Sequence, residues 1–125
     1  MGKRARRRSS EVGGQRATDE THAPTTVYTD ADGGELELRG ALTLKARAQY
    51  TGVLGGGLHQ EDAWQRATEL LFERLAVSWT IHGLRIDRQK ELLGRYRMAS
   101  ADERRFVRDS LRAHLRENFP ELEAP

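Results

Sequence analysis

The stretch that decides the fold runs from Gln60 to Ile81 and reads QEDAWQRATELLFERLAVSWTI. It contains no Gly or Pro, and both tryptophans of the chain lie in it. Read at helical spacing, its apolar residues form one stripe along the whole segment. The stripe consists of Trp64, Ala67, Leu71, Leu75 and Trp79. We therefore expect one long helix here, packed on more than one side as the centre of a small core.

The segment before this helix predicts a β-hairpin. Residues 25–29 read TTVYT and are all β-branched or aromatic, whereas residues 30–34 read DADGG and are rich in turn formers. Residues 35–39 then alternate strictly and place Leu36 and Leu38 on one face. Because an isolated hairpin is marginally stable in water, we expect both leucines to rest on the helices.

Capping signals define the remaining helices. Thr43 precedes a helix that must end at the three glycines 55–57, and His82-Gly83 is taken as the end of the central helix. A short helix is expected over residues 88–98. Ser100 and Glu103 have the spacing of a capping box, which predicts the start of a last helix extending to about Asn118.

The expected fold class is therefore mainly α, with an N-terminal β-hairpin at 25–39 followed by a compact four-helix domain around a central apolar helix. Residues 25–120 form the single domain. Residues 1–24 contain Val12 as their one large apolar side chain after Met1, which predicts a disordered basic N-terminal arm. Residues 121–125 are expected to fray.

Composition excludes several classes of protein. The chain has 125 residues and a net charge of +2, but residues 1–24 carry +3 and the rest −1, so the basic character belongs to the arm. It has no cysteine, which excludes a disulfide, a thiolate metal site and a thiol nucleophile. No apolar run approaches the ~20 residues of a membrane span, so we expect a cytoplasmic protein without a membrane partner. The bias towards Arg, Ala and Leu resembles that of high-GC bacterial genomes.

No set of residues indicates catalysis or metal binding. The four histidines are scattered through the sequence without metal-ligand spacing. Glu69 and Glu73 lie one helical turn apart, but Arg66 lies within reach of both and favours a solvated, ion-paired stripe over an acid–base pair. The three glycines match no phosphate-binding loop. We expect a non-enzymatic protein without cofactor or metal.

A row of arginines is the one chemical pattern above background. It repeats every four residues along the last helix, with one further arginine beside it, and five basic residues lie near the N-terminus. These residues are Arg104, Arg108, Arg112, Arg116, Arg105, Lys3, Arg4, Arg6, Arg7 and Arg8. Together they would form a two-part grip on phosphates. The alternative is a solvated helix face, offset locally by Asp109 and Glu117.

Two functions follow as hypotheses. The first is a small protein-interaction or adaptor module that binds a protein partner or a second copy through an apolar patch. The aromatic residues expected in the core or at such a contact are Tyr50, Trp64, Trp79, Tyr96 and Phe106. The second is a nucleic-acid- or ribosome-associated accessory protein that uses the arm and the arginine row.

Two resemblances accompany this interpretation. From Leu38 onward, segments such as HQEDAWQRATELLFERLAVSWTI and RQKELLGRYRMASADERRFVRDSL, with the MGKRARR start and the FPELE end, resemble a group of small uncharacterised actinobacterial proteins. That resemblance implies neither an activity nor a site. The run Val77-Ser78-Trp79 after a strand segment and a helix also resembles phage tail-assembly chaperones, although the long acidic loop of that family does not follow here.

Overall fold

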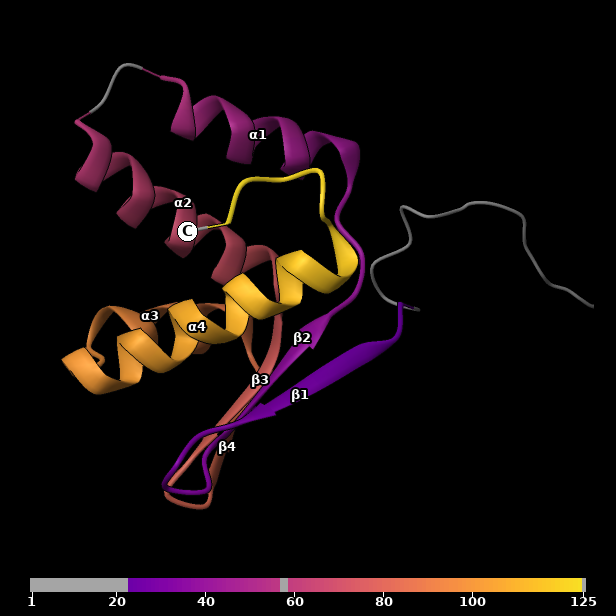
Figure 1. Cartoon of the computed structure of the whole chain (residues 1–125). Coiled ribbons are helices and arrows are strands. Elements are labelled where there is room, and N and C mark those ends of the chain that lie inside the picture. The colour runs from indigo at the N-terminus through magenta and orange to yellow at the C-terminus, as the bar shows by residue number, and fades with distance from the viewer. Residues whose placement is uncertain (1–22, 57–58, 125) are drawn as a thin grey trace, which may run out of the picture.

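The structure is a computed structural model and describes residues 23–56 and 59–124. It contains four helices and a four-stranded antiparallel sheet in the order β1-β2-β3-β4 (Figure 1). The elements are β1 (Thr25–Thr29), β2 (Glu35–Arg39), α1 (Leu44–Leu54), α2 (Gln60–Leu75), β3 (Ala76–Ile81), β4 (Leu84–Ile86), α3 (Gln89–Arg97) and α4 (Ala101–Asn118). The expectation of a mainly α fold with only a preceding hairpin was wrong, because the sheet takes two further strands from the middle of the chain.

The central segment is two elements and not one helix. α2 ends at Leu75, and Ala76 already has extended backbone angles with φ −69° and ψ 125°. The sequence AVSWTI that follows is rich in β-branched and aromatic side chains, and as β3 it pairs with β2. Trp79 is therefore buried from a strand, whereas the stripe of Ala67, Leu71 and Leu75 is buried from the helix as expected.

A tight turn joins β3 to β4. His82 and Gly83 both have positive φ, 53° and 80°, between the paired residues Ile81 and Leu84. Two consecutive residues with positive φ match the hairpin turns whose twist suits the flanking strands. The His-Gly pair thus reverses a strand and does not end a helix, which corrects the sequence-based interpretation.

The first hairpin forms where the sequence places it. β1 and β2 are antiparallel with Val27 opposite Glu37. In the turn, the Asp30 carboxylate accepts hydrogen bonds from the backbone N–H groups of Asp32 and Gly34, both at 2.8 Å, and Gly33 has φ 87°. The hairpin is the outer half of the sheet, since β3 pairs along the other side of β2.

The two faces of the sheet differ because side chains alternate along each strand. Leu36, Leu38 and Trp79 lie on one face and are at most 1% exposed. The helices gather on that side, and both hairpin turns project away from them (Figure 1). The largest fully buried side chains come from the sheet, from the helices and from the segment after α4, namely Trp79, Tyr50, Phe72, Phe119, Leu36, Leu38, Leu71, Leu75, Leu111, Leu115, His114 and Val107.

Both predicted helix caps are present. The Thr43 hydroxyl accepts a hydrogen bond from the Ala46 N–H at 3.0 Å. At α4, the Ser100 hydroxyl accepts from the Glu103 N–H at 3.1 Å, and the Glu103 carboxylate accepts from the Ser100 N–H at 2.9 Å. The capping box is confirmed, and hydrogen bonds from Arg95 and Ser100 lower the pKa of Glu103.

The segment after α4 packs on α1. Phe119 is 1% exposed. Arg47 forms an ion pair with Glu121 at 2.7 Å, and the Tyr50 hydroxyl donates to the Glu123 carbonyl. Residues 121–124, where the sequence suggested fraying, therefore connect the end of the chain to the first helix. Residues 1–22 of the expected arm lie outside the described residues.

One buried histidine joins α4 to the sheet. His114 is fully buried, and its Nε2 lies 2.8 Å from the Arg39 carbonyl, which can only accept. Nε2 therefore carries the proton, and Nδ1 accepts from the Tyr28 hydroxyl at 3.0 Å. Burial lowers the pKa of His114, so the neutral ring is the favoured form.

Candidate functional site

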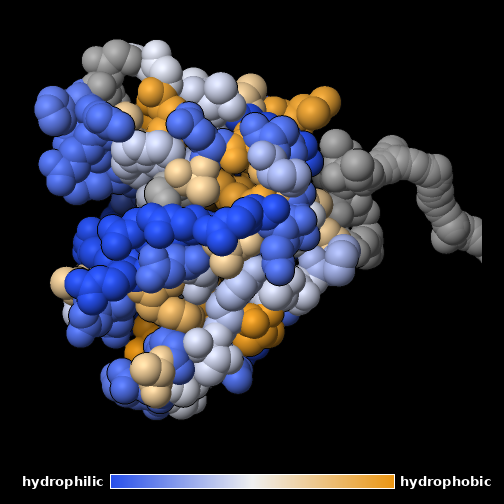
Figure 2. Space-filling view, in the orientation of Figure 1, coloured by the Kyte–Doolittle hydropathy of each residue, from blue (hydrophilic) through white to orange (hydrophobic). Residues whose placement is uncertain are grey.

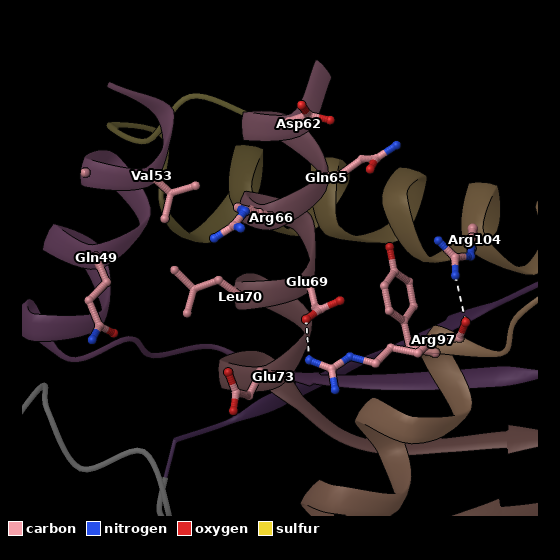
Figure 3. Close-up of a pocket in the computed structure, with 12 residues that line it drawn as sticks. Gln49, Val53, Asp62, Gln65, Arg66, Glu69, Leu70, Glu73, Arg97 and Arg104 are labelled. Carbon is pink, nitrogen blue, oxygen red and sulfur yellow. Dashed lines mark hydrogen bonds and ion pairs between the residues drawn. The ribbon is translucent and has the colours of Figure 1, made fainter. Parts of the chain in front are cut away.

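A groove of about 980 Å³ runs along the outward side of α2, between α1 and the junction of α3 with α4 (Figure 3). We call it the α2 groove. Its floor is a stripe of α2 at helical spacing, its first wall belongs to α1, and its second wall belongs to α3 and α4. It is lined by Gln49, Gly52, Val53, Asp62, Gln65, Arg66, Glu69, Leu70, Glu73, Tyr96, Arg97 and Arg104.

Polar contacts fix the second wall. Arg97 forms an ion pair with Glu69 on the floor at 2.7 Å, and Arg104 donates to the Arg97 carbonyl at 2.8 Å (Figure 3). Arg104 also donates to the Ala99 carbonyl at 3.3 Å and lies 5.4 Å from the ring centre of Tyr96. The hydrogen bond that Arg97 donates to the Glu69 carboxylate raises the pKa of Arg97. The guanidinium groups of this wall are thus engaged within the protein.

Charged groups of the floor remain open. Within residues 23–56 and 59–124, the side chains of Asp62, Arg66 and Glu73 make no hydrogen bond or ion pair, and all three line the groove. They follow one another along α2 as negative, positive, negative over about 16 Å, at 1.5 Å per residue. Leu70 from the floor and Val53 from α1 add an apolar strip beside them (Figure 3). The groove therefore presents both apolar contact and a fixed order of charges.

Tyr96 carries the polar group that best marks the groove. Its side chain is 7% exposed, and its ring stacks on Phe72 with 4.9 Å between centroids. Its hydroxyl lacks a hydrogen-bond partner throughout the described part of the chain. The hydroxyl is not enclosed, because the enclosed side-chain polar atom without a partner among the described residues is the Arg74 Nε, so the Tyr96 hydroxyl reaches the open groove. Burial raises the pKa of Tyr96, so the hydroxyl keeps its proton at neutral pH and is available as a donor.

Gly52 is the second unusual residue of the groove. It lies in the last turn of α1, where glycine costs about 0.5–1 kcal/mol relative to alanine. A Cβ at Gly52 would meet no atom within 4 Å, so packing within the chain does not require a glycine there. Because Gly52 has no side chain, the backbone of another segment can approach this part of the groove wall closely.

The groove does not have the chemistry of an active site. Of its carboxylates, Asp62 is exposed, Glu69 is ion-paired and Glu73 is half-buried, and no nucleophile lies beside a base among the lining residues. Across residues 23–56 and 59–124, no group of three or more His, Asp or Glu side chains is placed to hold a metal ion. The arrangement suits the docking of a polypeptide segment, with apolar contact, open charges and one hydroxyl that has no partner within the described residues.

The arginine row is only in part a free cationic surface. Figure 2 shows a band of hydrophilic residues along α4. Arg104 is engaged in the groove wall, Arg105 pairs with Asp102 at 3.3 Å, and Arg112 lies 3.7 Å from Asp109. Arg108 and Arg116 are exposed on the same helix. The acidic residues of α4 thus offset much of the positive charge that a phosphate-binding surface needs. The other residues of the predicted grip, Lys3, Arg4, Arg6, Arg7 and Arg8, lie outside the described residues.

The predicted contact aromatics take different places. Tyr50 and Trp79 are each 1% exposed and belong to the core. Trp64 and Phe106 are half-buried, and Tyr96 belongs to both the core and the groove. The exposed large apolar side chains among the described residues are Val27, Leu44, Leu84 and Met98, which lie on four separate segments. The described surface thus shows a groove with both polar and apolar lining residues, and the apolar docking patch stays a prediction.

Sequence reasoning missed the α2 groove. From the sequence, the charged residues of its floor were interpreted as a solvated, ion-paired helix face. Nothing in the local sequence places α1 and α3 on either side of that face. Gly52, a glycine inside a predicted helix, was the one available signal.

No protein-family model, curated protein or solved structure matches the chain. The resemblances to actinobacterial proteins and to phage tail-assembly chaperones stay predictions. Among the described residues, no helix is long and apolar enough to cross a membrane.

Proposed function

We propose that this protein is a small interaction module that holds a helical segment of a protein partner in the α2 groove. The observation that carries the proposal is the Tyr96 hydroxyl, which is protonated, lies on a residue only 7% exposed, and has no partner within the described part of the chain. An acceptor on a docked segment would supply the missing hydrogen bond. Because the hydroxyl reaches the open groove, this bond would replace one to water and would contribute about 0.5–1.5 kcal/mol.

The shape and charge of the groove support a helical occupant. Docked helices bind through residues spaced three or four apart, and the floor of α2 offers its groups at that spacing. Leu70 and Val53 would contact the apolar side of the partner helix. Basic groups on that helix would face Asp62 and Glu73, and an acidic group would face Arg66. Gly52 lets the backbone of the docked segment come close to α1.

The test compares capture of proteins from cells by matched variants. Tyr96→Phe removes the hydroxyl but breaks no hydrogen bond within the described structure, so we expect unchanged stability and weaker capture of a discrete partner. Gly52→Ala should stabilise the fold by about 0.5–1 kcal/mol and also weaken capture. Gly94→Ala is the control, because Gly94 also lies in the last turn of a helix and has open space around it, but does not line the groove.

Two results would contradict the proposal. In the first, the Tyr96 and Gly52 variants capture the same protein as efficiently as the parent. In the second, capture disappears after nuclease treatment and depends on Arg108 and Arg116, which would favour the nucleic-acid hypothesis instead. For that second result, titration with duplex DNA and RNA at two salt concentrations measures the phosphate contribution directly.

A further inference from the structure

The outer edge of β1 is a free strand edge. β1 is the terminal strand of the sheet, so within the described residues nothing pairs with its outer side. Its sequence, TTVYT, contains no charge and no proline, and its register with β2 has no bulge. Charged residues, prolines and bulges are features by which proteins prevent edge-to-edge pairing, and β1 has none of these three. The opposite edge, β4, has only three residues and carries the Arg85–Asp87 ion pair beside it.

The hydrogen bonds at both ends of the hairpin show which residues face this edge. The Gly40 N–H donates to the Pro24 carbonyl at 2.8 Å, and the Asp30 N–H donates to the Gly34 carbonyl at 2.9 Å. In an antiparallel pair, hydrogen-bonded and non-hydrogen-bonded positions alternate. The even-numbered residues therefore bond to β2. The N–H and C=O groups of Thr25, Val27 and Thr29 point outward.

We propose that two copies of this protein associate through β1, antiparallel, about a two-fold axis at Val27. In that register Val27 exchanges both backbone hydrogen bonds with Val27 of the second copy, and Thr25 does so with Thr29 of the second copy. The two sheets become one continuous sheet. An isologous pairing of this kind closes on itself and gives a dimer, not a filament.

Side chains on the open face of the sheet favour a second copy as the occupant. Val27 is 51% exposed at the centre of the strand, and the pairing covers it with its own counterpart. On β2, Arg39 neighbours Thr25 and Glu35 neighbours Thr29, so each Arg39 shares a row with the second copy's Glu35, three strand spacings or about 14 Å away, where screening leaves little attraction. Every residue directly across the junction is uncharged, so no like charges meet there.

The remaining like-charge pair is distant. Glu37 and its counterpart lie in the central row, three strand spacings or about 14 Å apart, beyond the screening length of about 8 Å at physiological salt. Glu37 also accepts hydrogen bonds from Thr25 at 2.6 Å and from Ser78 at 3.1 Å. Because a single short strand buries little surface, the dimer is weak and depends on concentration.

Sedimentation equilibrium of the full chain tests the proposal. The concentration should reach about 1 mM, because a weak dimer can have a dissociation constant in that range. The parent should approach twice the chain mass of 14.2 kDa as its concentration rises. Val27→Lys places like charges directly across the axis and should weaken association at least about tenfold. Val27→Pro removes only an outward N–H, which an edge strand tolerates, and should also weaken association. Circular dichroism confirms that each variant is folded.

The matched control is Leu84→Lys, which changes an exposed apolar residue on the opposite edge strand and should leave association unchanged. A parent that stays monomeric throughout the concentration range overturns the proposal. So does a folded Val27→Lys variant that associates as well as the parent, or association that is lost in Leu84→Lys and kept in Val27→Lys. Gel filtration of a mixture with a larger tagged copy should show exchange of subunits.

Discussion

Lowering the pH from 7.5 to 5.5 should destabilise this protein through His114. The ring is fully buried, and its Nε2 proton and Nδ1 lone pair are both used, by the Arg39 carbonyl and the Tyr28 hydroxyl. Protonating Nδ1 would turn an acceptor into a donor and place a charge in the core. Burial accordingly lowers the pKa of His114 from its ordinary value of 6.5.

The sign and size follow from proton linkage. Below pH 6.5 the unfolded chain binds a proton at this histidine and the folded chain does not, so the free energy of unfolding falls as the pH falls, down to the lowered pKa of the folded state. Above pH 6.5 both states are neutral and the contribution is constant. The slope in this window is at most about 1.4 kcal/mol per pH unit, and the loss between pH 7.5 and 5.5 is at most about 1.4 kcal/mol.

Urea unfolding followed by tryptophan fluorescence at pH 7.5, 6.5 and 5.5 measures the effect. With an m-value of about 1.5 kcal/mol/M, the midpoint should fall by up to about 1 M. His114→Gln is uncharged at every pH, so it should be less stable overall but should lose this pH dependence. The exposed His59→Gln is the control and should keep the parent's slope. If His114→Gln shows the same slope as the parent, the reasoning is refuted.

Two other predictions concern the fold. Ser100→Ala should lower the free energy of unfolding by about 1 kcal/mol, because it removes the side-chain acceptor of the α4 capping box, and Ser100→Asp should restore most of that stability; an unchanged midpoint for Ser100→Ala would contradict the role of the cap. Acrylamide should quench the half-buried Trp64 far more than Trp79, which is 1% exposed in the sheet, so the fluorescence of Trp64→Phe should resist quenching. Strong quenching of that folded variant would show that Trp79 is not enclosed.

Local signals determined much of the secondary structure. The β1–β2 hairpin, the cap at Thr43 and the Ser100–Glu103 box could all be read from the sequence, because each depends on residues within a few positions of one another. The burial of Ala67, Leu71 and Leu75 also followed from helical spacing. These features need no knowledge of the rest of the fold.

The division of the central stretch was decided by tertiary structure. In the sequence, Trp79 fits two patterns: it continues the helical stripe, and it also fits an alternating strand. A short apolar segment is compatible with both the helical period of 3.6 residues and the strand period of 2. Pairing with β2 selected the strand, because hydrogen bonds to a distant hairpin became available to residues 76–81. The positive φ at His82 and Gly83 completes the turn that this pairing requires.

The α2 groove and the buried histidine also depend on the tertiary structure alone. Tyr96 could be identified from the sequence as a core aromatic, but its place in a groove lined by α1 and α2 depends on how the helices pack. His114 and Tyr28 are far apart in the sequence, and only the packing of α4 on the sheet brings them to 3.0 Å. By itself, the sequence determined which segments form local structure. The long-range contacts decided which face each segment buries and which polar groups remain available for binding, because those contacts join residues that no local pattern connects.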